Sequence, residues 1–292
     1  MKINKKISYG IVFLLLLLPF MILFSSSVGS ADLSMFDSFQ ILLLKPYEKV
    51  YQTIIWKIRL PRILFAGISG FGLAIVGTAF QGLFKNPLAD PHILGVSSGA
   101  ALGATLAMFS GIGIHFMGLG VISIFAFIGA LITVMVVYQL SASATKAPMV
   151  NMLLAGTAIS TLLSSLISLL MTMRQDQIQK VYMWTLGSFS SATWTKVGFL
   201  FFVILLGSLL LYVFHREMDI MLIGVESAES LGIDTKKIRK FVLLIASFMV
   251  AACVSVAGVI GFVGLVIPHW MRLIFGPRHS SLLPLAGLCG AS

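Results

Sequence analysis

The chain has 292 residues, of which 58% are hydrophobic and 10% are charged, and its mean hydropathy is +1.03. Soluble domains carry about a quarter charged residues, so this composition excludes a soluble, disordered or fibrous protein and indicates a membrane protein. The net charge of +10 would suit a nucleic-acid binder only if the basic residues shared one solvated face. They instead separate apolar runs, as in multi-pass membrane proteins, and we expect no nucleic-acid partner.

Eight apolar stretches without an internal charge approach the length of about 20 residues that a helix needs to cross a bilayer. They lie at 7–24, 62–84, 93–112, 116–140, 149–173, 197–214, 241–258 and 259–271. A ninth apolar run begins near Ser281, and the sequence stops within it at Ser292. The pattern predicts an all-α polytopic membrane protein with a single transmembrane domain over 1–292, and it suggests that the natural chain continues.

The orientation follows from the loops. Twelve Lys and Arg residues fall on the side of the N-terminus and eight on the other, which favours a cytoplasmic N-terminus. The first stretch, with three lysines before it and SSSVGSA after it, also fits a cleavable signal peptide. Its apolar core is long for a signal and adequate for a span, so we expect it to be retained.

Ionisable residues are missing from the interiors of the predicted spans. All ten acidic residues lie in loops or at span ends, whereas ion-coupled carriers generally hold an ionisable group within the bilayer. This absence weakens the hypothesis of an ion-coupled secondary carrier or channel for a small solute, which is kept as the alternative function. The five histidines show no metal-ligand spacing, which disfavours an intramembrane metalloenzyme, and we expect no metal site.

Two further features bear on cofactors and redox chemistry. The sequence has no GxxxxGK[ST] phosphate loop, so any ATP would be hydrolysed by a partner. Cys253 and Cys289 are too few for a disulfide framework and are expected to pack in apolar surroundings.

Small residues recur every four positions on two predicted spans. Ala66, Gly70, Ala74, Thr78 and Gly82 form one such stripe, and Gly95, Gly99 and Gly103 form another. Stripes of this kind let helix backbones approach closely in membranes, so both are predicted to be packing surfaces.

The second span carries unusual residues at both ends. Arg59 and Arg62 flank Pro61 at its outer start, where they would either reach lipid phosphates or present fixed charges to a docking protein. The connection KNPLADP follows at the inner end, and its prolines argue against a simple helical hairpin. Irregular backbone here would border protein or a water-filled cavity, although a capped turn with a helix starting at Asp90 and Pro91 is also open.

Residues 215–240 form the longest charged stretch, with apolar residues interleaved and Gly224 and Gly232 as breaks. This pattern predicts two short amphipathic helices on the cytoplasmic face that dock a protein, a solvated loop being the alternative. Further on, Gly258, Gly261 and Gly264 precede a span that contains Pro268, which predicts a short, kinked helix.

In combination, these segments resemble the permease subunits of the iron-siderophore, haem and vitamin B12 family of ATP-binding-cassette importers. The resemblance rests on RLPR, on NPLADP followed by LGVSSGA, on a GxExAxxLG segment and on GFVGLVIPHxxR, in the family's order and over nearly all of the chain. It implies the fold of a type II importer permease with ten helices, of which about eight and a partial ninth are present here.

The resemblance also implies partners and roles. The permease would pair with a second copy or a paralogue, with two ATPase subunits, and with an extracytoplasmic substrate-binding protein, in a bacterial cytoplasmic membrane. It would hold no cofactor and catalyse no bond change, and it would import a metal chelate, first of all a ferric siderophore, else haem or cobalamin.

Three groups of residues would carry these roles. Arg59 and Arg62 would dock the binding protein. Asn86, Leu88, Ser143, Ala144 and Thr145 would lie near the cytoplasmic gate. Gly224, Glu226, Ala228, Leu231 and Gly232 would couple the permease to the ATPase.

Overall fold

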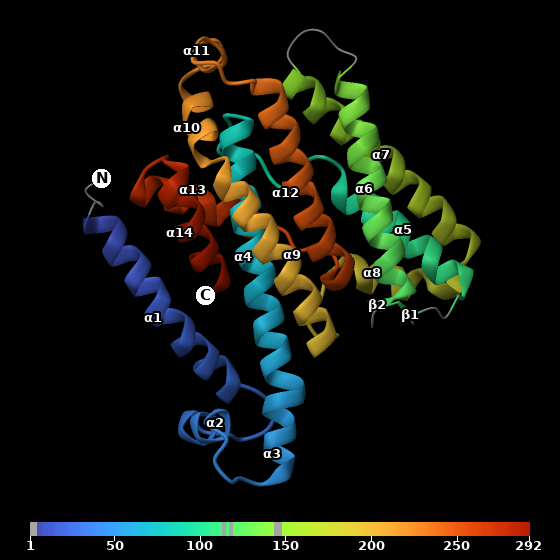
Figure 1. The fold of residues 1–292 in the computed structure, drawn as a ribbon. Coiled ribbons are helices and arrows are strands. Elements are labelled where there is room, and N and C mark those ends of the chain that lie inside the picture. The colour runs from blue at the N-terminus through green and yellow to red at the C-terminus, as the bar shows by residue number, and fades with distance from the viewer. Residues whose placement is uncertain (1–4, 113–114, 117–118, 143–147) are drawn as a thin grey trace.

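The protein folds as a bundle of helices (Figure 1). The computed structural model describes residues 5–112, 115–116, 119–142 and 148–292. The elements are α1 (Lys5–Ser27), α2 (Met35–Leu42), α3 (Lys49–Thr53), the π-helix η1 (Ile54–Arg59), α4 (Leu60–Leu83), α5 (Val96–Ser110), β1 (His115–Phe116), β2 (Leu119–Gly120), α6 (Val121–Ala142), α7 (Pro148–Met173), the 3₁₀-helix η2 (Gln175–Gln177), α8 (Ile178–Thr185), α9 (Trp194–Val213), α10 (His215–Ile223), α11 (Val225–Ser230), α12 (Thr235–Ala257), α13 (Val263–Phe275) and α14 (His279–Ala291).

The predicted all-α membrane architecture is confirmed. Over the described ranges, six helical segments are long and apolar enough to cross a membrane: Lys5–Ser27, Lys49–Leu83, Val121–Ser141, Met149–Met173, Trp194–Val213 and Thr235–Ala257. The predicted spans at 93–112 and 259–271 appear as the shorter apolar helices α5 and α13. The strands β1 and β2 form one small antiparallel pair, in which His115 is opposite Gly120.

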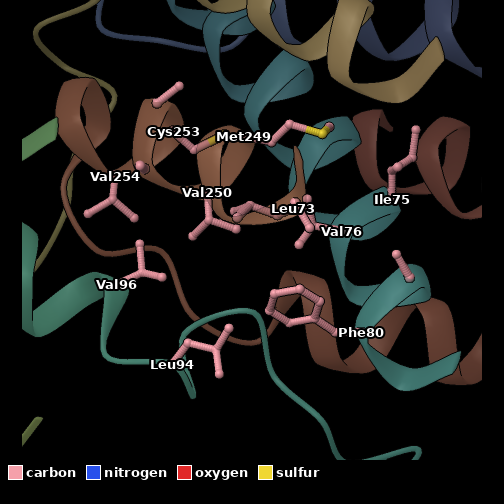
Figure 2. Close-up of a cluster of buried hydrophobic side chains, with 14 of the residues drawn as sticks. Leu73, Ile75, Val76, Phe80, Leu94, Val96, Met249, Val250, Cys253 and Val254 are labelled. Atoms are coloured by element: carbon pink, nitrogen blue, oxygen red, sulfur yellow. The ribbon is translucent and has the colours of Figure 1, made fainter. Parts of the chain in front are cut away.

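Helix α4 lies in the middle of the bundle, in contact with α9, α12, α13 and α14. Most of its residues from Ser69 to Leu83 are buried, and the same holds for the second half of α12. Figure 2 shows the core between them, where Leu73, Val76 and Phe80 of α4 face Val250 and Cys253 of α12. Cys253 is a free, buried thiol, as expected for a packing residue.

The glycines of α4 permit this central position. A Cβ on Gly70 would collide with the backbone carbonyl of Gly290 in α14, and one on Gly77 with that of Gly264 in α13. Backbones this close are possible only without side chains, as in small-residue packing of membrane helices. Gly70 belongs to the predicted α4 stripe, whose packing role is therefore confirmed, whereas Gly77 lies outside that stripe.

The second predicted stripe is confirmed in part. A Cβ on Gly99 would collide with Thr133 and the backbone of Gly129, so α5 packs closely on α6. Gly95, by contrast, lies outside the helix: it is the N-cap of α5, with a φ of 78°. Glycine adopts this left-handed conformation without the steric cost that a Cβ brings.

The span predicted to begin at residue 62 extends much further. Its helix runs without interruption from Lys49 to Leu83, through α3, η1 and α4. Pro61 has no N–H and its ring crowds the preceding turn, which disturbs regular α-helical hydrogen bonding. The wider π-turn of η1 immediately before Pro61 accommodates this disturbance, so the helix continues instead of ending.

The irregular connection after α4 is confirmed. No regular helix or strand occurs between Leu83 and Val96, so the alternative of a helix beginning at Asp90 and Pro91 is wrong. Asn86 Oδ1 accepts a hydrogen bond from the Leu88 backbone N–H at 2.9 Å, and Asp90 Oδ1 accepts one from that of His92 at 2.7 Å. These bonds favour local turns over helix.

The two ends of the bundle differ (Figure 1). One end carries α10, α11 and the first turns of α12, and is here called the α10 end. The opposite end carries α2, α3 and the β1–β2 pair, and is here called the α2 end. The short helices α2 and α8 were not predicted, because neither has the length or uniform hydrophobicity of a span.

Candidate functional site: the two ends of the permease

The two arginines at the α2 end occupy different environments. Arg59 is only 9% exposed, and its guanidinium donates hydrogen bonds to the backbone carbonyls of Ser26 at 2.6 Å and Ala31 at 3.0 Å. Arg62, one turn further along the helix, is exposed and lines a cavity of about 1000 Å³ between α1, α4, α9 and α14. Arg62 is thus the arginine that is free to meet another molecule.

This difference gives a testable prediction. Replacing Arg59 with alanine removes two charge-assisted hydrogen bonds and leaves two carbonyls without a donor, which should destabilise the protein by about 2 kcal/mol. Thermal unfolding in mild detergent measures this effect. The matched variant Arg62→Gln should unfold at the parental temperature, and an equally large loss of stability there would contradict the assignment.

The irregular stretch from Phe84 to Gly95, here called the gate stretch, carries two of the predicted gate residues at the α10 end, and both are accessible. Leu88 is 69% exposed, and Asn86 is half-buried and fixes the turn described above. The other three predicted gate residues, Ser143, Ala144 and Thr145, lie outside the described residues. The role of this stretch as a gate stays a prediction.

A histidine that was not predicted ties the gate stretch to the rest of the bundle. His92 Nε2 lies 2.8 Å from the carbonyl oxygen of Ile260, in the connection between α12 and α13. A carbonyl only accepts, so Nε2 carries the proton, and Nδ1 then accepts from Ser97 Oγ at 2.6 Å. The side chain links two irregular segments that are far apart in the sequence, a relation that no local pattern reveals.

Residues 215–240, here called the coupling segment, contain the two short helices that were predicted, α10 and α11. The last part of the segment, residues 235–240, is also helical and forms the first turns of the long helix α12. Asp234 caps that helix by accepting a hydrogen bond from the Lys237 backbone N–H at 3.0 Å. An N-cap before an apolar run favours extending the helix toward the cap, so the basic residues here belong to the same helix as the span.

The predicted coupling residues differ in exposure. Leu231, Glu226 and Gly232 are exposed, and Gly232 has a φ of 81°, which glycine adopts readily. Gly224 is half-buried at the break between α10 and α11, whereas Ala228 is fully buried and packs against the bundle. Ile223, which was not predicted, is 80% exposed. Ile223 and Leu231 are therefore two exposed apolar side chains at the α10 end.

Helix α7 presents a hydroxyl face that was also not predicted. Exposed serines and threonines recur three or four residues apart along it: Thr157, Thr161, Ser164, Ser165, Ser168 and Thr172. At about 100° per residue, all six fall on one side of the helix, together with the exposed Leu154, while the exposed leucines Leu162, Leu166 and Leu169 fall on another side. By contrast, the exposed large side chains of α9, the next span along the chain, are aromatic or aliphatic.

The comparisons with known proteins identify the family. Residues 15–292 match the model of the FecCD transport family. This chain belongs to the FecCD transport family. It is 41% identical over 243 residues to the cobalamin import system permease protein of Halobacterium salinarum, an alignment that spans 82% of this chain and 64% of that protein. It is 36% identical to the hemin transport system permease protein of Yersinia pestis, over 96% of this chain and 83% of that one.

A solved structure agrees with this assignment. The chain superposes with a TM-score of 0.84, at 33% identity, on an inward-facing metal-chelate type ABC transporter, covering 99% of this chain and 87% of the other. The FecCD member is therefore a multi-pass permease of the ABC transporter class, as its motifs predicted. These matches give no support to the alternative of an ion-coupled carrier or channel.

Proposed function

We propose that this FecCD-family chain is the permease subunit of an ABC importer that moves a metal chelate into the cytoplasm. The observation that carries the proposal is the superposition on a metal-chelate transporter over nearly the whole chain. A ferric siderophore is the first candidate substrate, and the relatives named for hemin and cobalamin supply the other two. The permease would catalyse no bond change and bind no cofactor of its own.

The proposed orientation places the α10 end in the cytoplasm together with the N-terminus, in the cytoplasmic membrane of the cell. This orientation is consistent with the fold, in which α10, α11 and the start of α12 lie at one end of the bundle and α2 and α3 lie at the other. Two ATPase subunits would then meet α10 and α11, and a substrate-binding protein would meet the α2 end, where the exposed Arg62 is the contact available to acidic groups.

The hydroxyl face of α7 indicates where the path of the substrate through the membrane would lie. A helix face directed at lipid is expected to carry apolar side chains, as the exposed face of α9 does. Six exposed hydroxyls on one side of a spanning helix suit a surface that water reaches. We therefore assign this face of α7 to the wall of a path formed between this permease and a second copy or a paralogue.

The proposed transport cycle is alternating access driven from the α10 end. ATP binding would move the ATPase subunits and with them α10 and α11, and the gate stretch would then open to one side or the other. To swing such an equilibrium from 1:99 to 99:1, nucleotide must favour one arrangement by about 5.5 kcal/mol.

The path assignment predicts a pattern of chemical accessibility. Cysteine introduced at Thr161 or Ser165 should react with a water-soluble thiol reagent at least about tenfold faster than cysteine at Leu166, on the leucine side of α7, because thiols in lipid neither ionise nor meet the reagent. The α9 variant Phe202→Cys, at a residue that is 71% exposed, is the control for a lipid-facing position. Equal rates at all four sites would rule out the path assignment.

The function itself is tested by uptake of labelled ferric siderophore, haem and cobalamin into iron-starved cells with and without this gene. Each measurement is repeated after inactivation of the partner ATPase and after collapse of the ion gradient. We expect the loss of one substrate in both knockouts and its persistence without the gradient. Uptake that depends on the gradient and not on the ATPase would overturn the proposal.

A further inference from the structure

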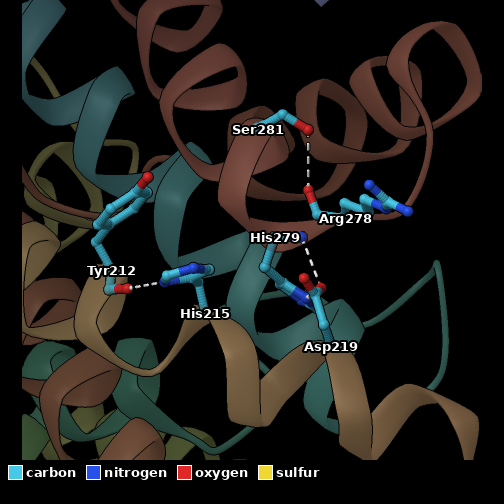
Figure 3. A network of polar contacts seen from close by, with 6 residues as sticks. All are labelled: Tyr212, His215, Asp219, Arg278, His279 and Ser281. Atoms are coloured by element: carbon cyan, nitrogen blue, oxygen red, sulfur yellow. Dashed lines mark hydrogen bonds and ion pairs between the residues drawn. The ribbon is translucent and has the colours of Figure 1, made fainter. Parts of the chain in front are cut away.

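Asp219 joins the short helix α10 to the first turn of α14 (Figure 3). One carboxylate oxygen, Oδ1, accepts hydrogen bonds from both the backbone N–H and the Nδ1 of His279, each at 2.7 Å. The side chain of His279 is fully buried and that of Asp219 is 29% exposed. Because an ionised carboxylate only accepts, Nδ1 of His279 is the donor of the second bond.

The carboxylate completes a helix end that lacks a cap of its own. The residue before α14, Arg278, makes no side-chain hydrogen bond to the first turn. The first N–H groups of a helix need acceptors, and its positive end favours a negative charge. Burial alone would raise the pKa of Asp219, but the hydrogen bonds from the His279 side chain and backbone outweigh it, so that pKa lies below its ordinary value. Asp219 is therefore ionised at neutral pH and caps α14 from another helix.

His279 also lies against the last turn of α4. A Cβ on Gly82 would collide with Nε2 of His279, an atom that has no hydrogen-bond partner among the described residues. The chain leaves α4 after Leu83 and enters the gate stretch that carries Asn86 and Leu88. One imidazole thus contacts the coupling segment, the start of α14 and the helix turn that leads into the gate stretch.

Other contacts hold α10 less specifically. Its buried residues Met218 and Met221 pack on the bundle, and methionine side chains adapt to shifted neighbours. Two short hydrogen bonds to one oxygen fix both the distance and the direction between α10 and α14. A small movement of α10 would therefore move α14 through the hydrogen bonds of Asp219, while the methionine contacts of α10 could still adapt to it.

We propose that Asp219 and His279 form a positioning link that makes the α10 ends of α14 and α4 follow α10 when an ATPase subunit moves the coupling segment. The link rests on the proposed function and adds to it the residues that carry the movement inward. Without the link, the ATPase would still dock and hydrolyse ATP, while the gate stretch would no longer respond to nucleotide.

The test uses the full permease with its ATPase subunits in proteoliposomes. The parent protein carries two changes. Leu88→Cys reports on the gate stretch, and Cys289→Ala removes the native thiol that is partly accessible. The other native thiol, Cys253, is buried and is kept. The measured quantity is the rate at which the thiol introduced by Leu88→Cys reacts with a water-soluble maleimide, with and without ATP and vanadate. In this parent we expect nucleotide to change the rate about tenfold, and in His279→Ala we expect a ratio near one with ATP hydrolysis retained.

Two matched variants separate a link from simple packing. The side-chain amide nitrogen of His279→Asn can take the place of Nδ1 and reach Asp219, whereas that of His279→Gln falls near the position of Nε2, away from Asp219. We expect asparagine to keep most of the nucleotide response and glutamine to lose it, although glutamine fills the volume better. Equal responses in the two variants would overturn the link.

Gly82 provides an independent approach to the same contact. Gly82→Ala should abolish the response by displacing His279, although alanine favours a helix by about 1 kcal/mol over glycine. Gly198→Ala in α9, where an added Cβ meets nothing within 4 Å, should leave the response unchanged.

The outcomes separate the link from the proposed function. A parental nucleotide response in His279→Ala would overturn the link alone. No response in the parent, despite ATP hydrolysis by the assembled complex, would overturn the alternating-access function and the link with it. If His279→Ala does not assemble, Asp219→Ala provides a change at a more exposed residue; it removes both bonds, whereas His279→Ala removes only the side-chain bond, and a parental response there would equally overturn the link.

Discussion

Replacing both Ile223 and Leu231 with aspartate is expected to abolish the association of this permease with its ATPase subunits. The two side chains are 80% and 69% exposed at the α10 end, at the ends of the short helices α10 and α11. Exposed apolar side chains of this size commonly anchor protein interfaces, and loss of each such anchor costs about 2 kcal/mol. The double variant should therefore bind the ATPase about a thousandfold more weakly, because each 1.4 kcal/mol is a factor of ten.

Copurification of tagged permease with the ATPase subunits measures this effect. The matched control is Leu44→Asp, which changes an equally exposed leucine at the α2 end. We expect Leu44→Asp to retain the ATPase fully. Retention of the ATPase by the double variant would show that the coupling surface lies elsewhere on the α10 end.

Replacing Gly77 with leucine is expected to prevent the folding of the bundle. A Cβ at this position would already collide with the backbone carbonyl of Gly264 in α13, and backbone cannot move aside as a flexible side chain can. Leucine would force α13 away from α4 and open the core on both sides. Overpacking of a buried site costs about 1–3 kcal/mol when neighbours can relax, and a clash between two backbones exceeds that range.

The fraction of monodisperse protein after extraction in mild detergent measures the result. We expect almost none for Gly77→Leu and a parental amount for Gly198→Leu, since an added Cβ at Gly198 in α9 meets nothing nearby. A well-folded Gly77→Leu protein would mean that α4 and α13 are less tightly packed than the structure shows.

The predicted spans illustrate what hydrophobic pattern can and cannot reveal. Apolar runs located every long helix, because the bilayer demands a continuous apolar length whatever the neighbours are. The pattern missed the extension of α4 back to Lys49, where charged residues such as Lys57 lie in helix beyond the apolar run. It also grouped residues 235–240 with the short helices α10 and α11, whereas the Asp234 cap starts the long helix α12 there.

The predicted site residues show a similar division. Short motifs were sufficient to indicate the family and to place Arg59, Asn86, Leu88 and Gly232 at the ends of the bundle. Exposure then separated residues that looked equivalent in the sequence. Arg59 is used inside the chain and Arg62 is free, and Ala228 is buried while its neighbour Leu231 is exposed.

By itself, the sequence determined that this is an all-α membrane permease of the FecCD type, because composition, span length and motif order are read along the chain and do not require knowing which residues meet in space. Tertiary structure alone decided that Gly77 meets Gly264, that His92 reaches Ile260 and that Asp219 caps the helix of His279. Each of these pairs joins segments that are far apart in the sequence, and their closeness results from the packing of the whole bundle, which no local pattern encodes.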